Sequence, residues 1–179
     1  MNRFISRLGV FTLSALLFGS TAFGKTGMGA VGLHGGFNFS KNNNSLTPGG
    51  TASTTDYLVG AFYESSGDLI HFQPEFNYVK KSIANYLSIP LLLKIAIESP
   101  AVRPFLVIGP AIGLKVDGPL ANTFDLSLDI GGGVGFELMP GFSLLAEARY
   151  SLGFVNVSST AGDIRTRGIY LLVGAAFTL

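Results

Sequence analysis

Residues 70–78 read IHFQPEFNY and residues 87–97 read LSIPLLLKIAI, and these two stretches decide the fold. In the first stretch the even positions are apolar and the odd positions from His71 to Asn77 are polar. In the second the apolar residues occupy the odd positions. A period of two predicts β-strands. Each segment holds about ten residues, close to the ~9–11 with which a tilted strand crosses a bilayer.

The same alternation recurs along the chain and predicts eight strands in all. A polar stretch from Lys41 to Asp56 has no period and predicts a mobile loop between the first two. The expected strands cover residues 29–40, 57–64, 70–78, 87–97, 103–116, 123–138, 142–155 and 168–179. The fold class expected is all-β, an eight-stranded antiparallel up-and-down transmembrane β-barrel.

The composition favours a membrane over water. Charged residues make up 13% of the chain, about half the roughly 25% of ordinary soluble domains. Mean hydropathy is +0.45, yet no run of apolar residues is long enough for a spanning helix. A closed barrel is the other structure that satisfies every backbone polar group in hydrocarbon.

The two faces of the expected strands differ in charge. The apolar faces carry no Asp, Glu, Lys or Arg, as a lipid-facing surface requires, since a Lys or Arg at the bilayer midplane costs about 2–4 kcal/mol. Eight strands leave a lumen that side chains fill. We expect the inward charges to form a structural ion-pair network there. An ion pathway or an acid/base pair is the alternative. The charges are Glu64, Glu75, Lys94, Lys115, Asp125, Asp129, Glu137, Glu147 and Arg149.

The first 24 residues have the features of a secretory signal. Arg3 and Arg7 precede an apolar stretch at 8–19, and Ala22-Phe23-Gly24 provides a small-x-small cleavage site. A short membrane anchor is disfavoured because about 12 apolar residues cannot cross a bilayer. We therefore expect a signal peptide at 1–24 and an outer-membrane barrel domain at 25–179, with both ends of the mature chain in the periplasm.

The connections between strands predict the orientation. Those between strands 2–3, 4–5 and 6–7 are short, 1–2 and 7–8 are long, and 3–4 and 5–6 are intermediate, the pattern of periplasmic turns and outer loops. Four basic residues in the expected outer loops are candidates for binding lipopolysaccharide phosphates, or simply form a solvated rim. They are Lys80, Lys81, Arg165 and Arg167.

Few residues offer other chemistry. His34 and His71 are the two histidines, neither lies in a Ser/His motif, and the chain has no Cys, so catalysis and a metal site are both disfavoured. The glycine run 131–135 lacks the Lys-Ser/Thr and the helix of a phosphate-binding loop. The net charge of +1 gives no indication of nucleic-acid binding. No cofactor is expected.

Three prolines fit the strands poorly. Pro74, Pro90 and Pro110 lie within expected strands, where each removes a backbone donor. We expect β-bulges at these points to accommodate them.

Five short motifs in this order resemble the PorT-like outer-membrane β-barrel family common in Bacteroidota. They are QPEFNY at 73–78, YLSIPLLLK at 86–94, RPF at 103–105 leading to Gly109-Pro110, GGGVGFE at 131–137 and EARYSLG at 147–153. The resemblance implies the fold and an outer-membrane location, and the namesake of the family is linked to protein secretion. The tail GAAFTL at 174–179 resembles the signal read by the barrel-assembly machinery, although it ends in Leu where an aromatic residue is usual.

These observations favour a non-enzymatic, monomeric barrel that contacts outer-membrane lipid and lipopolysaccharide. We expect it to act through its outer loops in adhesion, envelope integrity or as a secretion accessory. An outer-membrane lipid-modifying enzyme and a narrow channel are the alternatives.

Overall fold

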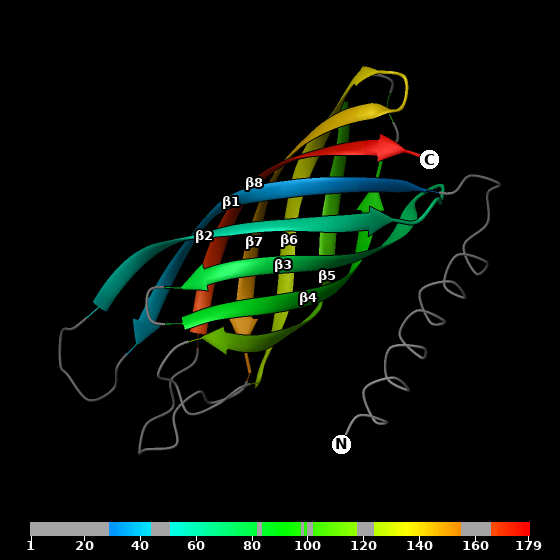
Figure 1. Ribbon diagram of the computed structural model, residues 1–179. Coiled ribbons are helices and arrows are strands. Elements are labelled where there is room, and N and C mark those ends of the chain that lie inside the picture. Colours follow the sequence, from blue (N-terminus) through cyan, green and yellow to red (C-terminus); the bar gives the residue numbers. More distant parts are fainter. Residues whose placement is uncertain are drawn as a thin grey trace, which may run out of the picture.

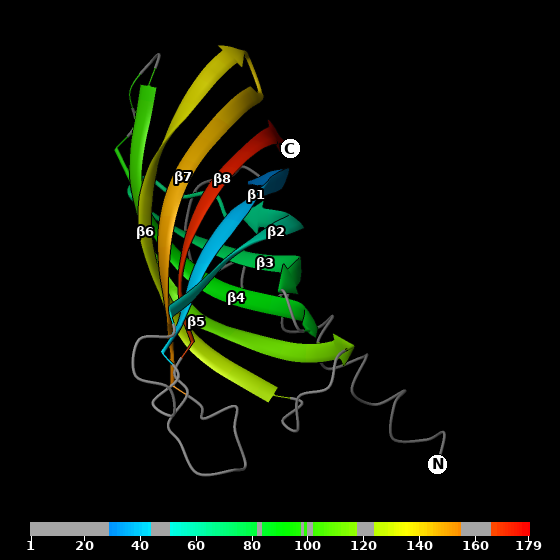
Figure 2. The same ribbon diagram turned by 90° about the vertical axis from the view of Figure 1, so that its left-hand side faces the viewer.

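The described part of the chain forms eight antiparallel strands that close into a barrel. The computed structural model describes residues 29–43, 51–81, 84–97, 99, 102–117, 124–154 and 166–179, so the expected signal peptide lies outside it. Figures 1 and 2 show the strands wrapped around one interior. The strands are β1 (Ala30–Asn43), β2 (Thr51–Glu64), β3 (Ile70–Lys81), β4 (Ala84–Ala96), β5 (Val102–Asp117), β6 (Phe124–Met139), β7 (Phe142–Gly153) and β8 (Thr166–Thr178).

Each strand pairs with its neighbours in the sequence, and β1 pairs with β8 to close the wall. The closing ladder runs from Ala30↔Thr178 to Asn42↔Thr166, and β1 and β8 lie side by side in Figure 1. The predicted eight-stranded antiparallel barrel is therefore confirmed. None of the described residues forms a helix that is long and apolar enough to cross a membrane.

The two faces of the wall are as predicted, apolar outside and polar inside. Exposed apolar side chains alternate with buried ones along the strands, for example Leu33, Phe76, Leu106 and Ile130. The buried polar and charged set includes His34, Asn38, Glu64, His71, Gln73, Glu75, Asn77, Lys94, Asp125, Asp129 and Arg149. The exposed large apolar side chains thus face the surroundings of the barrel, and the charges face its interior.

The first hairpin is longer than predicted. The stretch from Lys41 to Asp56 was expected to be a loop, but β1 continues to Asn43 and β2 begins at Thr51, paired from Asn43↔Thr51 onward. The added residues, 41–43 and 51–56, are nearly all polar, so the alternation of apolar and polar positions that marks the other strands is missing here. Backbone pairing and the strand preference of threonine extend the hairpin instead.

The connection between β3 and β4 also differs from the prediction. Strand β3 runs to Lys81 and β4 begins at Ala84, so this connection comprises residues 82–83 and is no longer than the β6–β7 turn at 140–141. As a result, β3 includes Lys80 and Lys81, which were predicted to lie in a loop. Arg167 also lies in a strand, because β8 begins at Thr166. We call the end with the connections after β2, β4 and β6 the turn end, and the opposite end the loop end. The C-terminus lies at the turn end (Figure 1).

The expected bulges at the prolines are wrong. At Pro90 and Pro110 the pairing toward the preceding strand is interrupted and then resumes in unchanged register, whereas at Pro74 the ladder with β2 ends at Phe62↔Glu75 without a register shift. Pro74 pairs with Leu91 of β4 but not with β2, Pro90 pairs with Ala111 of β5 but not with β3, and Pro110 pairs with Leu128 of β6 but not with β4. A strand residue directs its N–H toward one neighbour, so a proline interrupts one ladder and leaves the other intact.

The register shifts lie elsewhere. One falls between Asn85 and Tyr86 where β4 pairs with β5, and the other falls between Glu137 and Met139 where β6 pairs with β7. Both lie near strand ends, where bulges are common.

Candidate functional site in the barrel interior

An ion cluster centred on Arg149 of β7 crosses the lumen. Its guanidinium binds the Glu75 carboxylate of β3 through two bonds of 2.9 Å, in the paired geometry that suits arginine and carboxylate. Glu147 accepts a third bond of 2.7 Å, and an Asp129 oxygen lies 3.8 Å away. Because β3 and β7 are opposite each other in the closed order of strands, the Arg149–Glu75 pair joins opposite walls.

Neutral polar side chains complete this cluster. Gln73 and Asn77 donate to the Glu75 carboxylate at 2.8 and 2.9 Å, and the His34 ring donates from Nε2 to the Asn77 oxygen at 2.7 Å. The alternation in β3 places Gln73, Glu75 and Asn77 on the inner face. The Arg149 cluster is thereby held from β1, β3, β6 and β7.

A second cluster centres on Glu64 near the turn end. Lys94 and Arg103 each donate to its carboxylate at 2.7 Å. His71 donates from Nδ1 to the Ser65 carbonyl at 2.8 Å and accepts at Nε2 from Arg103 at 2.7 Å, since a guanidinium can only donate. The Lys94 ammonium, 1% exposed as a residue, also lies 4.1 Å from the centre of a phenyl ring, that of Phe105.

The two clusters have opposite charge surpluses. Around Arg149, one cation faces three carboxylates, those of Glu75, Glu147 and Asp129. Around Glu64, one carboxylate faces the two cations Lys94 and Arg103. Burying charge is tolerated when it is paired and hydrogen-bonded, as most of these groups are. The interior is therefore more positive toward the turn end and more negative around and beyond Arg149.

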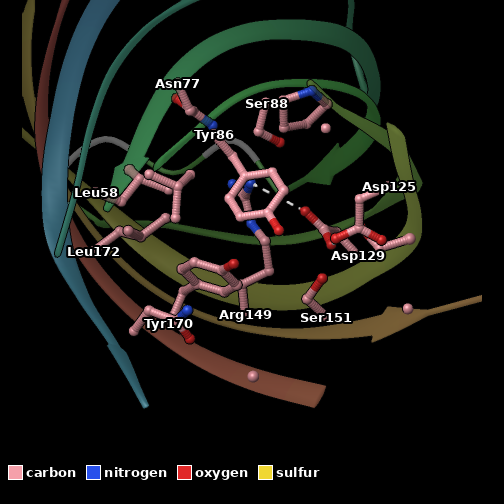
Figure 3. Close-up of a pocket in the computed structure, with 17 residues that line it drawn as sticks. Leu58, Asn77, Tyr86, Ser88, Asp125, Asp129, Arg149, Ser151, Tyr170 and Leu172 are labelled. Carbon is pink, nitrogen blue, oxygen red and sulfur yellow. Dashed lines mark hydrogen bonds and ion pairs between the residues drawn. The ribbon is translucent and has the colours of Figure 1, made fainter. Parts of the chain in front are cut away.

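A cavity lies between the Arg149 cluster and the loop end. The space open to water-sized molecules is about 40 Å³, enough for roughly three waters. Figure 3 shows Asp129, Ser151 and Arg149 near the rings of Tyr86 and Tyr170, with Leu58 and Leu172 at another side. A smaller void of about 10 Å³ lies near His34, Lys94 and Glu147, toward the turn end.

Most of the predicted network residues lie in this interior. Glu64, Glu75, Lys94, Asp125, Asp129 and Arg149 are buried, and Glu147 and Lys115 are half-buried. Glu137 differs, because it is exposed beside the register shift at the end of β6. Sequence reasoning missed the roles of five residues in these clusters, although their odd or even positions matched the inward face of their strands. They are His34, His71, Gln73, Asn77 and Arg103.

The four basic residues expected at the outer rim are only partly described. Lys80 is exposed in β3, and its ammonium lies 5.5 Å from the ring centre of Tyr57. Arg167 is exposed at the start of β8, in register with Lys41 of β1. The Lys81 side chain and Arg165 lie outside the described residues.

The histidines lie away from the surface that a membrane lipid would touch. His34 and His71 are 9% and 3% exposed and point into the lumen. Among the described residues, the polar groups that contact their rings are an amide, a guanidinium, a backbone carbonyl and carboxylates, and none of these is a serine hydroxyl. Within the described ranges, no group of three or more His, Asp or Glu side chains is placed to hold a metal ion.

Comparison with known proteins identifies the family. The model of the outer membrane protein beta-barrel domain family matches residues 8–177, nearly the whole chain. No curated protein sequence matches this chain significantly.

Solved structures share the fold at low sequence identity. Neisserial surface protein A is 18% identical with a TM-score of 0.58, over 84% of this chain and 99% of that one. The N-terminal barrel domain of Pseudomonas aeruginosa OprF is 12% identical with a TM-score of 0.59, over 86% and 100%. The outer membrane enzyme PagL is 14% identical with a TM-score of 0.53, over 81% and 97%. The chain belongs to the outer membrane protein beta-barrel domain family and is an outer-membrane protein.

Proposed function

We propose that this outer-membrane barrel is a non-enzymatic protein with a sealed interior that acts through its loop end. The roles that fit are adhesion, envelope integrity or accessory work in secretion. The observation that carries the proposal is the Arg149–Glu75 pair, which joins opposite walls of the lumen with two bonds of 2.9 Å. Because such a pair crosses the lumen and a second cluster lies at Glu64, we infer that the described residues leave no continuous path for solutes.

The position of the histidines supports the non-enzymatic assignment. A lipid-modifying enzyme works on substrates that lie against the outside of the wall, whereas both rings point inward. The test is analysis of lipid A from cells with and without the protein. We expect an unchanged acyl pattern, and a change that depends on His34 or His71 would overturn the assignment.

The sealed interior is tested by conductance in planar bilayers. Insertion of the folded protein should leave the current at the lipid baseline, because the charged side chains bind each other and leave no open water column. Stable current steps from the wild-type protein would instead establish the narrow channel.

The loop end is proposed to face the exterior, with the turn end and both ends of the mature chain in the periplasm. Lys80 and Arg167 are exposed near the loop end and, with Lys81 and Arg165, are proposed to contact lipopolysaccharide phosphates. Strand β8, which closes the wall against β1, is the proposed contact for the barrel-assembly machinery, and the barrel is proposed to be a monomer. Within the family we assign the chain to the PorT-like barrels on the five motifs described above.

The role of the loop end is tested by replacing residues 44–50 or 155–165 with short Asn-Gly turns. Heat-modifiable gel migration reports whether each variant still folds as a barrel. We expect folded variants that lose adherence, detergent resistance or secretion. The matched control replaces residues 66–69 of the turn-end connection and keeps Ser65, whose carbonyl binds His71. Loss of function in that control alone would contradict the proposal.

A further inference from the structure

The cavity beyond Arg149 has one acidic and hydroxyl-bearing side and one apolar side. Asp129 and its neighbours Ser127 and Ser151 form the first, and Ser127 lies 3.5 Å from an Asp129 oxygen. The apolar side is formed by a cluster of four buried residues, with Tyr170 packed against them. These are Leu58, Val79, Tyr86 and Leu172. A ligand that fits both sides has a polar, charged end and a small apolar body.

The charge around the cavity selects a cation. The Arg149 guanidinium is already bound by Glu75 and Glu147 at 2.7–2.9 Å, so it has little capacity left for an anion. Asp129 is farther from it, at 3.8 Å, and lies on the cavity side. Three carboxylates around one guanidinium leave a surplus of negative charge next to this space, where the low dielectric strengthens its effect.

A second and independent feature also indicates a ligand. Asn38 of β1 is 1% exposed, lines the cavity, and neither atom of its amide has a hydrogen-bond partner among the described residues. A buried amide without a hydrogen-bond partner is unfavourable, and a bound molecule that bonds to it would relieve that penalty. Gly168 provides the room for it, because a β-carbon there would lie 2.6 Å from the Asn38 oxygen.

We propose that this cavity binds a small primary ammonium compound, with the ammonium at Asp129, a hydroxyl or ammonium proton donated to Asn38, and the carbon chain against Tyr86, Tyr170 and Leu172. The rings suit a cation, since an aromatic face attracts positive charge. Space for roughly three waters limits the ligand to a few heavy atoms, the size of 2-aminoethanol.

The test is an NMR titration of the folded protein in detergent micelles at constant ionic strength. Amide shifts of Ser127, Ser151 and Gly153 report on the cavity. We expect saturation by 2-aminoethanol and none by 1,2-ethanediol, which replaces the ammonium with a hydroxyl. O-phosphoethanolamine, the soluble counterpart of a lipid headgroup, should bind at least tenfold more weakly, because its phosphate meets the surplus carboxylates.

Variants separate a specific site from a diffuse charge effect. Asp129→Asn should weaken 2-aminoethanol at least tenfold and Asn38→Ala about fivefold, by loss of a charged and a neutral hydrogen bond respectively. Glu137→Gln removes the same charge as Asp129→Asn but at the turn end, and should leave the affinity unchanged within twofold. Ser151→Leu fills the cavity without altering charge and should abolish saturation, which tests the site even if Asp129→Asn does not fold.

Two results would overturn the proposal. Saturation by 1,2-ethanediol at the same midpoint would show that the cavity does not select a cation. Equal affinity in the wild type and in Ser151→Leu, or in a folded Asp129→Asn, would show that the amine binds elsewhere.

Discussion

The Arg149 and Glu64 clusters occupy the same lumen but solve the problem of buried charge differently. Arg149 is one cation that gathers three carboxylates, whereas Glu64 is one carboxylate that gathers two cations. Loss of Arg149 would leave three carboxylates without their cation, whereas loss of Lys94 would leave Glu64 still paired with Arg103. The two clusters should therefore respond unequally when a cation is removed.

The largest effect is expected for Arg149→Met. The substitution leaves Glu75, Glu147 and Asp129 buried without their cation, and breaking a buried pair in this way costs about 3–5 kcal/mol. The free energy of unfolding, measured by urea titration in micelles with heat-modifiable migration as the readout, should fall by that amount. The double variant with Glu75→Gln should be less destabilised than Arg149→Met alone. Stability equal to the wild type would contradict the central role of Arg149.

Lys94→Met should have a smaller effect. Glu64 keeps Arg103 as a partner at 2.7 Å, so the carboxylate remains paired. We expect a loss of about 1–3 kcal/mol in the same urea titration, the cost of a lost hydrogen bond to a charged group. Adding Glu64→Gln should increase the loss further, because it leaves Arg103 without its carboxylate partner. A loss larger than that of Arg149→Met would reverse the comparison.

Gly60→Ala should disturb the Arg149 cluster indirectly. A β-carbon at Gly60 would overlap the Asn77 side-chain oxygen, so Asn77 must move away from His34 and Glu75. Such overpacking costs about 1–3 kcal/mol. We expect the upper half of that range, because the added carbon would also lie 2.8 Å from the backbone carbonyl oxygen of Phe76, which cannot turn away as a side chain can. The matched control is Gly35→Ala, where the nearest atom would lie 3.4 Å away, and its unfolding midpoint should stay close to that of the wild type.

Glu137→Gln should have the smallest effect. This carboxylate is exposed at the end of β6, outside both clusters, and surface substitutions stay within about 0.5 kcal/mol. An unchanged urea midpoint would confirm that the network ends before Glu137. A loss comparable to that of Lys94→Met would place Glu137 back within it.

The alternation of the strands was sufficient to predict the wall and the direction of its side chains. It placed Glu75 and Arg149 on the inner face, and the structure has both there. It did not reveal that they bind each other, because the two lie 74 positions apart and their heights depend on the register of every strand between them. Arg103 was missed for a simpler reason. It lies at the beginning of β5, although its odd position matches the inward face of that strand.

The loop predicted at residues 41–56 is wrong in part, because the first hairpin continues beyond the apolar part of the barrel wall. Beyond Phe39, neither face of the first hairpin is apolar, so a paired ladder and a loop have the same composition. The prolines show the converse case. Their missing donors were recognised in the sequence, but a ladder with an interrupted pair and unchanged register accommodates them without the extra residue of a bulge.

The unequal length of the ladders has a mechanical consequence. The terminal strands β1 and β8 pair along nearly the whole height of the barrel, from Ala30↔Thr178 to Asn42↔Thr166. The ladder between β2 and β3 is shorter and runs from Tyr57↔Lys80 to Phe62↔Glu75. The β1–β8 ladder can form only after β8 has been synthesised, yet it is longer than the β2–β3 ladder. Under thermal or lateral stress the cylinder should split between β2 and β3, and deuterium should enter the amides flanking Pro74 before it reaches those of the terminal strands.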